Sequence, residues 1–386
     1  MNSKDRILVT GGSGFLGGRL VEALAKSGAR IRVATSDFRH CARVARFPVE
    51  LVKADLIRPE ALARAAADCD IIFHFGYRFG GSPKEQQRAN VEGTRALAEA
   101  LLKSGGRRLV HISSVAAYGP ARDGDLAETS PPQPTTDAYA NTKLAIDDML
   151  RDLYRNRGLP VSILQPTVVY GPYGPYWTVR LLEQVSIGQV VLPAQGLGLC
   201  NAVYVDDVVA AALLAAEHDA AIGQAFLISG SAPTTWREFY GAYEAMAGKQ
   251  SIVFLNDLEV RAEERRQQKH HSLLGKVRRE LARRPSAREV LLKQPPFTWF
   301  DTAARQLPAS AQAFLQDRLQ AIWNVPTQSP PVFIPDAGDK VLFAAKVNVR
   351  IDKARRVIGY EPAFDLARGM ALTQKWAKWA NLIGSD

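Results

Sequence analysis

Two side chains four residues apart, Tyr139 and Lys143, have the types and the spacing needed for proton exchange. They belong to the run Tyr-Ala-Asn-Thr-Lys, which opens a predicted helix and therefore places positions i and i+4 on one face. A phenol with a pKa of about 10 is a poor base at neutral pH, but a neighbouring ammonium stabilises phenolate. Tyr139 could then exchange a proton with a substrate oxygen. Taken alone, such a pair is more often an ordinary surface pair.

A further hydroxyl group, that of Ser114, follows a predicted strand upstream. The run His-Ile-Ser-Ser-Val-Ala-Ala-Tyr-Gly from position 111 is typical of a strand end followed by a loop. The carboxyl ends of parallel strands face the ligand crevice, so we expect Ser114 to donate a hydrogen bond to the same substrate oxygen. The alternative is a serine that caps the turn.

A glycine-rich turn, Thr10-Gly-Gly-Ser-Gly-Phe-Leu-Gly17, lies between a predicted strand and a predicted helix. Gly11 permits the tight turn, Gly14 leaves room for a pyrophosphate, and Gly17 lets helix and strand pack closely. The free N–H groups of a helix N-terminus attract phosphates. The sequence therefore predicts a bound nicotinamide dinucleotide, which would exchange a hydride with the carbon whose oxygen meets Tyr139.

Three positions bear on how the dinucleotide is held. After the second predicted strand, an acidic residue would bind the ribose hydroxyls of NAD, and an arginine would suit the phosphate of NADP. Asp37 could serve NAD, whereas Ser36 with Arg39 or Arg43 could serve NADP; we lean slightly to NADP. Asp55, at the end of the third strand, is expected to accept a hydrogen bond from the adenine amino group, with a helix N-cap as the alternative.

The elements that must position these groups alternate between strand and helix patterns, which predicts a doubly wound parallel sheet of the Rossmann type. Continuous apolar runs are typical of strands that are buried on both faces. The predicted strands are Ile7–Thr10, Ile31–Thr35, Val49–Lys53, Ile71–Phe75, Leu109–Ser113, Val161–Leu164 and Ala225–Ser229. The predicted helices between them are Leu16–Lys26, Pro59–Ala66, Ala89–Lys103 and Ala138–Arg155.

The pattern predicts two domains. Residues 1–170, rejoined at about 197–230, are expected to form the dinucleotide-binding domain. Residues 171–196 and 231–386 are expected to form a smaller, mainly C-terminal α+β substrate-binding domain, with a basic helical insert at about 255–345. The net charge of +10 is concentrated in this insert, because Val260–Lys293 holds eleven Lys and Arg against four Glu.

Such a local charge does not resemble a nucleic-acid footprint, so we expect a small-molecule partner and no nucleic acid. Three interpretations of the insert remain: a solvated helix closing over the active site, which we favour, a site for an anionic part of the substrate, or a segment resting on an acidic membrane surface. No apolar run approaches the roughly 18 residues of a membrane span. A homodimer is the assembly we consider.

The three cysteines, Cys41, Cys69 and Cys200, form no CxxC pair and cannot all pair within one chain, which predicts a reducing, cytoplasmic setting. No cluster of His, Cys and carboxylate residues has the spacing of metal ligands, so no metal site is expected.

Together these motifs resemble the extended short-chain dehydrogenase/reductase family, the group of NAD-dependent epimerases and dehydratases. The matching runs are Thr10–Gly17, Ala54-Asp55, Phe73-His74, Asn90–Thr94, Ser113-Ser114, Tyr139 with Lys143, Pro166–Pro172 and Val205–Asp207, and near the end Lys353–Phe364. The resemblance implies Ser114, Tyr139 and Lys143 as the catalytic set and places Pro166 near the nicotinamide. By the same resemblance, Phe15, Leu16 and Leu56 are expected beside the cofactor and Val169 beside the substrate.

Several departures from the family pattern concern the substrate. Dehydratases of the family carry Asp-Glu where Val115-Ala116 stand here, so elimination of water is not expected. Gln165 and Val168 replace the Arg and Asn of an Arg-Pro-x-Asn run, and Cys200-Asn201 stand where another Arg is common. These replacements weaken the pyrophosphate grip expected for a nucleotide sugar. Tyr77 and Arg78 replace an alanine pair and are expected to line the substrate side, with loop filling as the alternative.

The resemblance predicts an NAD(P)-dependent oxidoreductase or epimerase that acts on a secondary alcohol or ketone, with a sugar or nucleotide sugar as the first expectation. The alternative is a dehydrogenase or reductase of a lipophilic substrate, like the 3β-hydroxysteroid dehydrogenase and dihydroflavonol reductase branches. A third class, a non-catalytic cofactor-sensing protein, usually lacks the Tyr or the Lys, and both are present here.

Overall fold

The computed structural model describes residues 4–271 and 330–384. The chain divides into two compact units. One comprises residues 1–186, 192–252 and 335–386, and the other comprises residues 187–191 and 253–334. The first unit contains every residue that the sequence assigns to the cofactor and to catalysis. The predicted division into cofactor and substrate domains near residue 170 stays a prediction, since compactness does not report which residues bind substrate.

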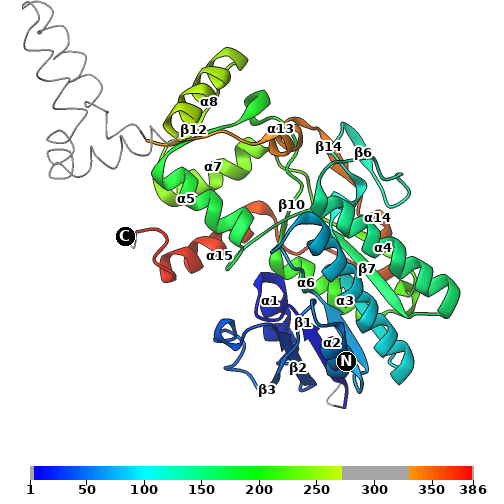
Figure 1. Cartoon of the computed structure of the whole chain (residues 1–386). Coiled ribbons are helices and arrows are strands. Elements are labelled where there is room, and N and C mark those ends of the chain that lie inside the picture. The colour runs from blue at the N-terminus through cyan, green and yellow to red at the C-terminus, as the bar shows by residue number, and fades with distance from the viewer. Residues whose placement is uncertain (1–3, 272–329, 385–386) are drawn as a thin grey trace, which may run out of the picture. The chain divides into compact units, whose positions relative to one another are not determined.

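The core of the first unit is a seven-stranded, fully parallel sheet, as predicted. Its strand order is β11-β7-β5-β4-β1-β2-β3, so the chain winds outward in one direction from β1 and then returns to wind in the other (Figure 1). The strands are β1 (Arg6–Thr10), β2 (Arg30–Thr35), β3 (Val49–Lys53), β4 (Ile71–His74), β5 (Arg108–Ile112), β7 (Val161–Pro166) and β11 (Ala225–Ile228). This is the doubly wound Rossmann arrangement.

Helices cover both faces of this sheet (Figure 1). One apolar cluster joins the sheet to α1 (Phe15–Leu24), α6 (Val205–Glu217) and α14 (Asp352–Ile358). A second apolar cluster joins the sheet to α2 (Pro59–Ala66) and to two long helices, α3 (Pro83–Ser104) and α4 (Ala138–Arg157). The sheet is buried on both faces, which explains why its strands are continuous apolar runs.

The two long helices, α3 (Pro83–Ser104) and α4 (Ala138–Arg157), pack against each other. The predicted start of α3 at Ala89 is wrong by about two turns, because the first turns are polar and carry no apolar period. Ser82 and Glu85 form a reciprocal capping box there, in which the Ser82 side chain accepts from the Glu85 backbone N–H and Glu85 accepts from that of Ser82.

The C-terminal part of the chain returns to the first half. β14 (Val347–Val349) pairs in parallel with β6 (Gly124–Leu126), and β10 (Ala202–Tyr204) pairs in parallel with β8 (Val168–Tyr170). The Asp207 carboxylate accepts hydrogen bonds from the backbone N–H groups of Ala363 and Phe364, which fixes the chain ahead of the last helix. The remaining helices of this unit are α5 (Arg180–Ile187), α7 (Trp236–Ala247), α13 (Ala337–Ala344) and α15 (Leu366–Trp379).

The second unit contains a three-stranded sheet in the order β12-β9-β13. Its strands are β12 (Ile252–Val253), β9 (Gln189–Val191) and β13 (Val332–Phe333), and the helix α8 (Asp257–His271) follows β12. Within the predicted basic helical insert, α8 is helical as expected. The rest of the predicted basic insert, including Arg278, Arg279, Arg283 and Arg284, lies outside the described residues.

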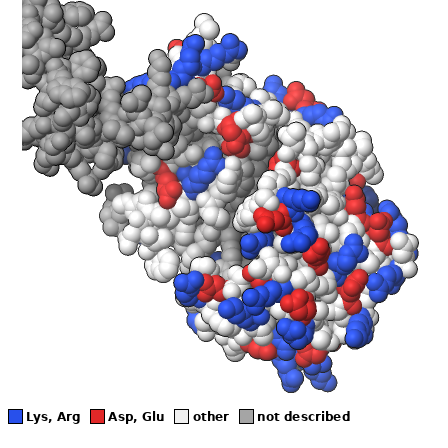
Figure 2. Space-filling view, viewed as in Figure 1, with Lys and Arg blue, Asp and Glu red and all other residues white. Residues whose placement is uncertain are grey.

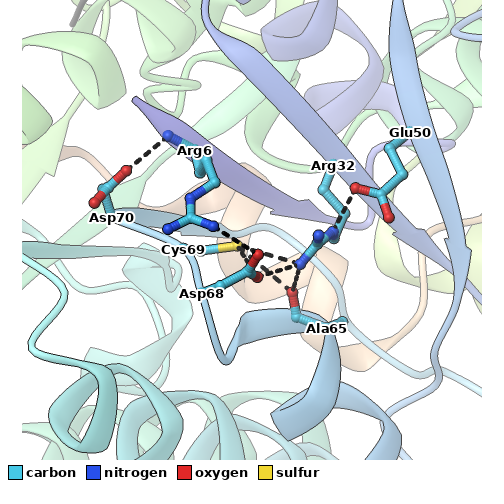
Figure 3. A network of polar contacts seen from close by, with 7 residues as sticks. All are labelled: Arg6, Arg32, Glu50, Ala65, Asp68, Cys69 and Asp70. Carbon is cyan, nitrogen blue, oxygen red and sulfur yellow. Dashed lines mark hydrogen bonds and ion pairs between the residues drawn. The ribbon is translucent and has the colours of Figure 1, made fainter. Parts of the chain in front are cut away.

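A polar network ties together the first three strands and the turn after α2 (Figure 3). Arg32 on β2 donates to Glu50 on β3, to Asp68 and to the carbonyl of Ala65. Arg6 on β1 donates to the other oxygen of Asp68 at 2.9 Å. These links lie on the side of the sheet covered by α2 and leave the glycine-rich end of β1 clear of them.

Charges of both signs are interspersed on the lower part of the face drawn in Figure 2. This part of that face therefore gathers no broad field of one sign. Among the residues that the structure describes, no helix combines the length and the apolar character needed to cross a bilayer.

Candidate active site

The turn between β1 and α1 has the geometry that the three glycines predict. Gly11 has φ +68°, and a Cβ there would lie 2.7 Å from the Gly76 backbone nitrogen. A Cβ on Gly17 would fall on the Gly11 carbonyl oxygen, so helix and turn touch directly. Gly14 is exposed at the start of α1, and a Cβ there would meet only the Gly11 oxygen, at 3.2 Å. The space above Gly14 is thus an open cradle that fits a pyrophosphate.

The residues flanking this turn differ in their surroundings. Phe15 and Leu16 begin α1 and are partly buried, and Leu16 packs against the core cluster on that face of the sheet. Leu56 is buried against Gly93 of α3. Asp55 is partly exposed, and its Oδ1 accepts from the Ile57 backbone N–H. The alternative of a helix N-cap at Asp55 is wrong, because α2 begins after Arg58.

Both arginines considered for NADP are engaged by carboxylates. Arg39 forms an ion pair with Asp37 at 2.6 Å, and the hydrogen bonds from Arg39 lower the pKa of the Asp37 carboxyl to about 2. Arg43 pairs with Glu22 at 2.8 Å and lies over the Tyr173 ring. Ser36 is exposed. Asp37 and Arg39 therefore act as a pair after β2, and the preference for NADP stays a prediction.

The structure brings Ser114, Tyr139 and Lys143 together at the carboxyl end of β5. The Asp137 side chain caps α4 by accepting from the Tyr139 backbone N–H at 2.8 Å. One turn later the Lys143 side chain, only 3% exposed, donates from Nζ to the Ile112 carbonyl at 2.7 Å. Ser114 caps the short helix η2 (Val115–Tyr118), as in the predicted alternative, and its hydroxyl also faces Tyr139.

Burial dominates the electrostatics of this pair. It raises the pKa of the Tyr139 phenol to about 12, and the contact with the Ser114 hydroxyl acts in the opposite direction. Burial also lowers the pKa of the Lys143 ammonium to about 8, against the attraction of Asp147. At neutral pH Tyr139 is therefore a proton donor beside a lysine that is still mostly charged.

The loop after β4 supplies an aromatic wall next to Tyr139. The Tyr77 ring lies 5.0 Å from the Tyr139 ring, edge to face, and 4.9 Å from the Lys143 Nζ. The Phe79 ring is stacked on Tyr139 at 6.0 Å and is 72% exposed. Asn90 holds this loop by accepting from the Arg78 N–H and donating to the Arg78 carbonyl. Tyr77 thus lies beside the catalytic pair, and its contact with substrate stays a prediction. Arg78 is fixed through its backbone, and Phe79 was not predicted.

Two further predicted residues lie on β7 and β8. Pro166 ends β7 and pairs with Ile228 of β11. Val169 belongs to β8, where it pairs with Val203 and packs against the core cluster on the α1 side of the sheet. Packing therefore explains Val169 by itself, and its predicted contact with substrate stays a prediction.

Several buried polar residues behind the catalytic pair were not predicted. The Asp147 carboxylate accepts from the Gln165 side chain, and Gln165 in turn accepts from the Tyr118 hydroxyl. Two histidines from neighbouring strands, His74 and His111, lie with ring centroids 5.2 Å apart. The i+8 spacing of Asp147 from Tyr139 is the signal that could have found the first group.

Comparison with known proteins places this geometry in a family. Residues 7–229 match the sequence model of the NAD dependent epimerase/dehydratase family. The chain belongs to this family. The matched segment spans the glycine-rich turn, the Ser114, Tyr139 and Lys143 group and the sheet up to β11.

Curated relatives of this family member include two redox enzymes. The chain is 30% identical over 253 residues, 63% of its length and 76% of the relative's, to a 2-alkyl-3-oxoalkanoate reductase from Stenotrophomonas maltophilia (strain K279a). It is 29% identical over 251 residues, 61% of its length and 68% of the relative's, to a 3-beta-hydroxysteroid dehydrogenase from Mycolicibacterium neoaurum.

Solved structures of the family share the fold at lower identity. A UDP-glucose 4-epimerase from Thermotoga maritima has a TM-score of 0.65 at 20% identity, with 97% of this chain and 99% of that chain covered. A UDP-glucuronic acid 4-epimerase from Bacillus cereus, in complex with NAD, has a TM-score of 0.66 at 18% identity over 97% of this chain and 96% of that chain. This family member is therefore an NAD-dependent epimerase, dehydratase or reductase by descent, and the open cradle above Gly14 fits that cofactor.

Proposed function

We propose that this family member reduces a ketone, or oxidises the matching secondary alcohol, on a largely apolar substrate. Tyr139, Ser114 and Lys143 would be its catalytic residues. The observation that carries the proposal is the aromatic wall of Tyr77 and Phe79, which lies against the Tyr139 ring. The exposed Phe79 ring and the partly buried Tyr77 ring beside the reacting group favour an apolar substrate body, because binding would bury further apolar area.

The position of Gln165 supports an apolar substrate over a nucleotide sugar. Its amide group is only 1% exposed and is engaged on both ends, by Asp147 and by Tyr118. Because it is buried and held by these two partners, it is poorly placed to donate to a pyrophosphate. Several curated relatives also act, by their names, on ketones or alcohols of apolar molecules: the oxoalkanoate reductase, the hydroxysteroid dehydrogenase and a sterol-4-alpha-carboxylate 3-dehydrogenase of Candida albicans.

The chain's residues would divide the chemistry as follows. A bound nicotinamide supplies or accepts the hydride at the carbon of the reacting group. In reduction, Tyr139 donates its proton to the carbonyl oxygen while Ser114 holds that oxygen through a hydrogen bond. Lys143 stabilises the phenolate that remains. In oxidation the same proton passes from the alcohol to the Tyr139 phenolate.

A second candidate, sugar 4-epimerisation, follows from the sparse catalytic set. Val115 and Ala116 stand in η2 directly after Ser114, and no acid or base is contributed by either. Epimerisation needs none, since a keto intermediate can rotate and receive the same hydride on its other face. It would proceed without net consumption of cofactor, which separates it from the first candidate.

Two assays test the proposal. The first follows cofactor absorbance with a panel of 3-oxoacyl esters and 3-ketosteroids, and the second follows UDP-glucose by NMR. We expect stoichiometric oxidation of NADH or NADPH with at least one apolar ketone. Phe79→Ala should raise KM for that ketone by about 10-fold and change kcat little, because uniform binding is lost. Trp379→Ala removes an equally exposed ring, 72%, from the end of α15 and should change neither. Conversion of UDP-glucose without cofactor turnover would overturn the proposal in favour of the epimerase.

A further inference from the structure

A buried carboxylate lies one helical turn beyond Lys143 and takes no part in the proton exchange described above. Asp147 is 0% exposed. Its Oδ2 accepts from the Gln165 Nε2 at 2.8 Å, and the Gln165 Oε1 accepts from the Tyr118 hydroxyl at 2.9 Å. Tyr139, Lys143 and Asp147 follow one another at four-residue spacing and share one face of α4.

This carboxylate is poorly justified by stability alone. A buried charge is expensive unless it is fully paired, and an apolar side chain of similar size often serves the fold as well or better. The Asp147 Oδ1 completes no hydrogen bond among the described residues, and the nearby Ser113 hydroxyl offsets only part of the effect of burial. Burial accordingly raises the pKa of the Asp147 carboxyl to about 6. A group held at such a cost indicates a function.

The groups that face Asp147 show what that function is. The cations near it are Lys143 and Arg151 on its own helix, and both lower the pKa of its carboxyl. Ser113 from the end of β5, Gln165 from β7 and Tyr118 from η2 are neutral. Asp147 in turn opposes the effect of burial on the Lys143 ammonium, which the neutral imidazoles of His74 and His111 also face.

We propose that Asp147, held in place by Gln165 and Tyr118, is a positioning residue that keeps the Lys143 ammonium charged and so controls the acidity of the Tyr139 phenol. The effect on catalysis rests on the proposed function, whereas the effect of Asp147 on the charge of Lys143 does not. Without Asp147 the desolvated ammonium would lose its proton at a lower pH, and Tyr139 would lose its cationic neighbour near neutrality.

The direct test is the titration of Lys143 in the cofactor-free protein. Carbon-13 NMR of lysine-labelled protein would follow the Lys143 signal, assigned by its absence in Lys143→Arg. Asp147→Asn keeps the acceptor for Gln165 and removes the charge. We expect it to lower the titration midpoint of Lys143 by about one pH unit or more, the size of shift that a nearby opposite charge produces. Asp148→Asn is the matched control, because Asp148 is an exposed carboxylate on the same helix.

A kinetic readout accompanies the titration. If the proposed reductase activity is present, the pH profile of kcat in Asp147→Asn should move in the direction of the Lys143 midpoint. Should Asp147→Asn fail to fold, Tyr118→Phe removes the outer hydrogen bond and is expected to shift Lys143 in the same direction by a smaller amount. An unchanged Lys143 midpoint in folded Asp147→Asn overturns the inference. A shifted midpoint without any reductase activity upholds the inference and contradicts only the proposed function.

Discussion

Lys143 contacts or faces several other groups of the candidate site. Its Nζ donates to the Ile112 carbonyl, lies 4.9 Å from the Tyr77 ring and 5.8 Å from the Tyr139 ring, and is attracted by Asp147. Each contact favours the charged form of an amine that is otherwise removed from water. The ammonium is thus held by an oxygen, two rings and a carboxylate, each from a different position in the chain.

Replacing Tyr139 by Phe tests the central role of its hydroxyl. The variant keeps the ring that packs against Tyr77 and Phe79 and loses only the proton donor. We expect kcat to fall by about 100-fold or more, the scale of a lost general acid or base, with NAD(P) affinity within about two-fold by calorimetry. A fully active Tyr139→Phe enzyme would contradict the proposed chemistry.

The buried histidines predict an acid sensitivity of the fold. Burial lowers the pKa of His74 to about 3 and holds that of His111 well below its usual range. Both are neutral in the folded state and take up protons below about pH 6.5 only when unfolded, so stability falls as the pH drops below that value. Because neither ring nitrogen of His111 has a partner among the described residues, His111→Leu removes one such proton without breaking a hydrogen bond.

Urea unfolding at pH 7 and pH 5.5 measures this effect. We expect the wild type to lose about 1 kcal/mol more than His111→Leu between the two pH values, from the linkage of one proton. His218→Gln, at an exposed histidine after α6, should behave as the wild type does. Equal losses in wild type and His111→Leu would show that this imidazole titrates alike in both states.

At the scale of elements, two glycines of the glycine-rich turn are needed for different reasons. Gly17 is buried and meets the Gly11 carbonyl, whereas Gly14 is exposed with an ordinary extended backbone, φ −87° and ψ −171°. Only the first is required by packing. Gly14 is the N-cap of α1 and a Cβ there would meet only the Gly11 oxygen, at 3.2 Å, so the space above it is open enough for a ligand.

Two substitutions in this turn should therefore have different signatures. Gly14→Val places a branched side chain in the cradle, and we expect NAD(P) affinity to fall by about 100-fold or more. Because Gly14 is also the N-cap of α1, we expect a loss of about 1 kcal/mol of stability in a protein that still folds. Gly17→Ala forces helix and turn apart and should cost about 1–3 kcal/mol of stability. Calorimetry and thermal melts check both; a Gly14→Val protein that binds NAD(P) normally would show that the pyrophosphate lies elsewhere.

The sheet could be predicted because its strands are continuous apolar runs that alternate with helical patterns. The meeting of Ser114, Tyr139 and Lys143 could be predicted because positions i and i+4 share a helix face and the carboxyl ends of parallel strands meet at one edge of the sheet. The start of α3 could not, since its first turns are polar and only the capping box marks them. Asp147 stands beside Asp148 in the sequence, and only helix packing makes one buried and the other exposed. Phe79 depends on the loop that Asn90 fixes, a contact across twelve residues that no local pattern reports.

At the scale of the whole chain, the first compact unit is closed by its C-terminal segment. The Tyr360 hydroxyl donates to the Ser229 carbonyl at 2.8 Å, β14 pairs with β6, and Asp207 holds the backbone at Ala363 and Phe364. All predicted cofactor and catalytic residues lie between residues 11 and 166. Residues 187–191 and 253–334 form a unit that contributes none of them.

Excision of residues 256–329 tests this separation. In the three-stranded sheet β12 and β13 flank β9, so these two strands lie about 10 Å apart, twice the spacing of neighbouring strands. A Gly/Ser linker of about eight residues spans this distance. We expect NAD(P) affinity within about two-fold of the wild type by calorimetry, and altered KM for the ketone if the insert serves the substrate side. A large loss of cofactor affinity in the folded variant would contradict the assignment.

The three cysteines are all buried and unpaired, and burial raises the pKa of the Cys69 thiol to about 11 and holds that of the Cys200 thiol well above its usual range. A thiolate is the species that reacts with alkylating reagents, so Cys69 and Cys200 react little at neutral pH, and burial shields Cys41 from such reagents. The protein is thus ready for site-directed spectroscopy without removal of any cysteine. A single cysteine introduced at Leu258 on α8, which is 75% exposed, would carry one reporter, and a second at Trp379 would turn the chain into a molecular ruler.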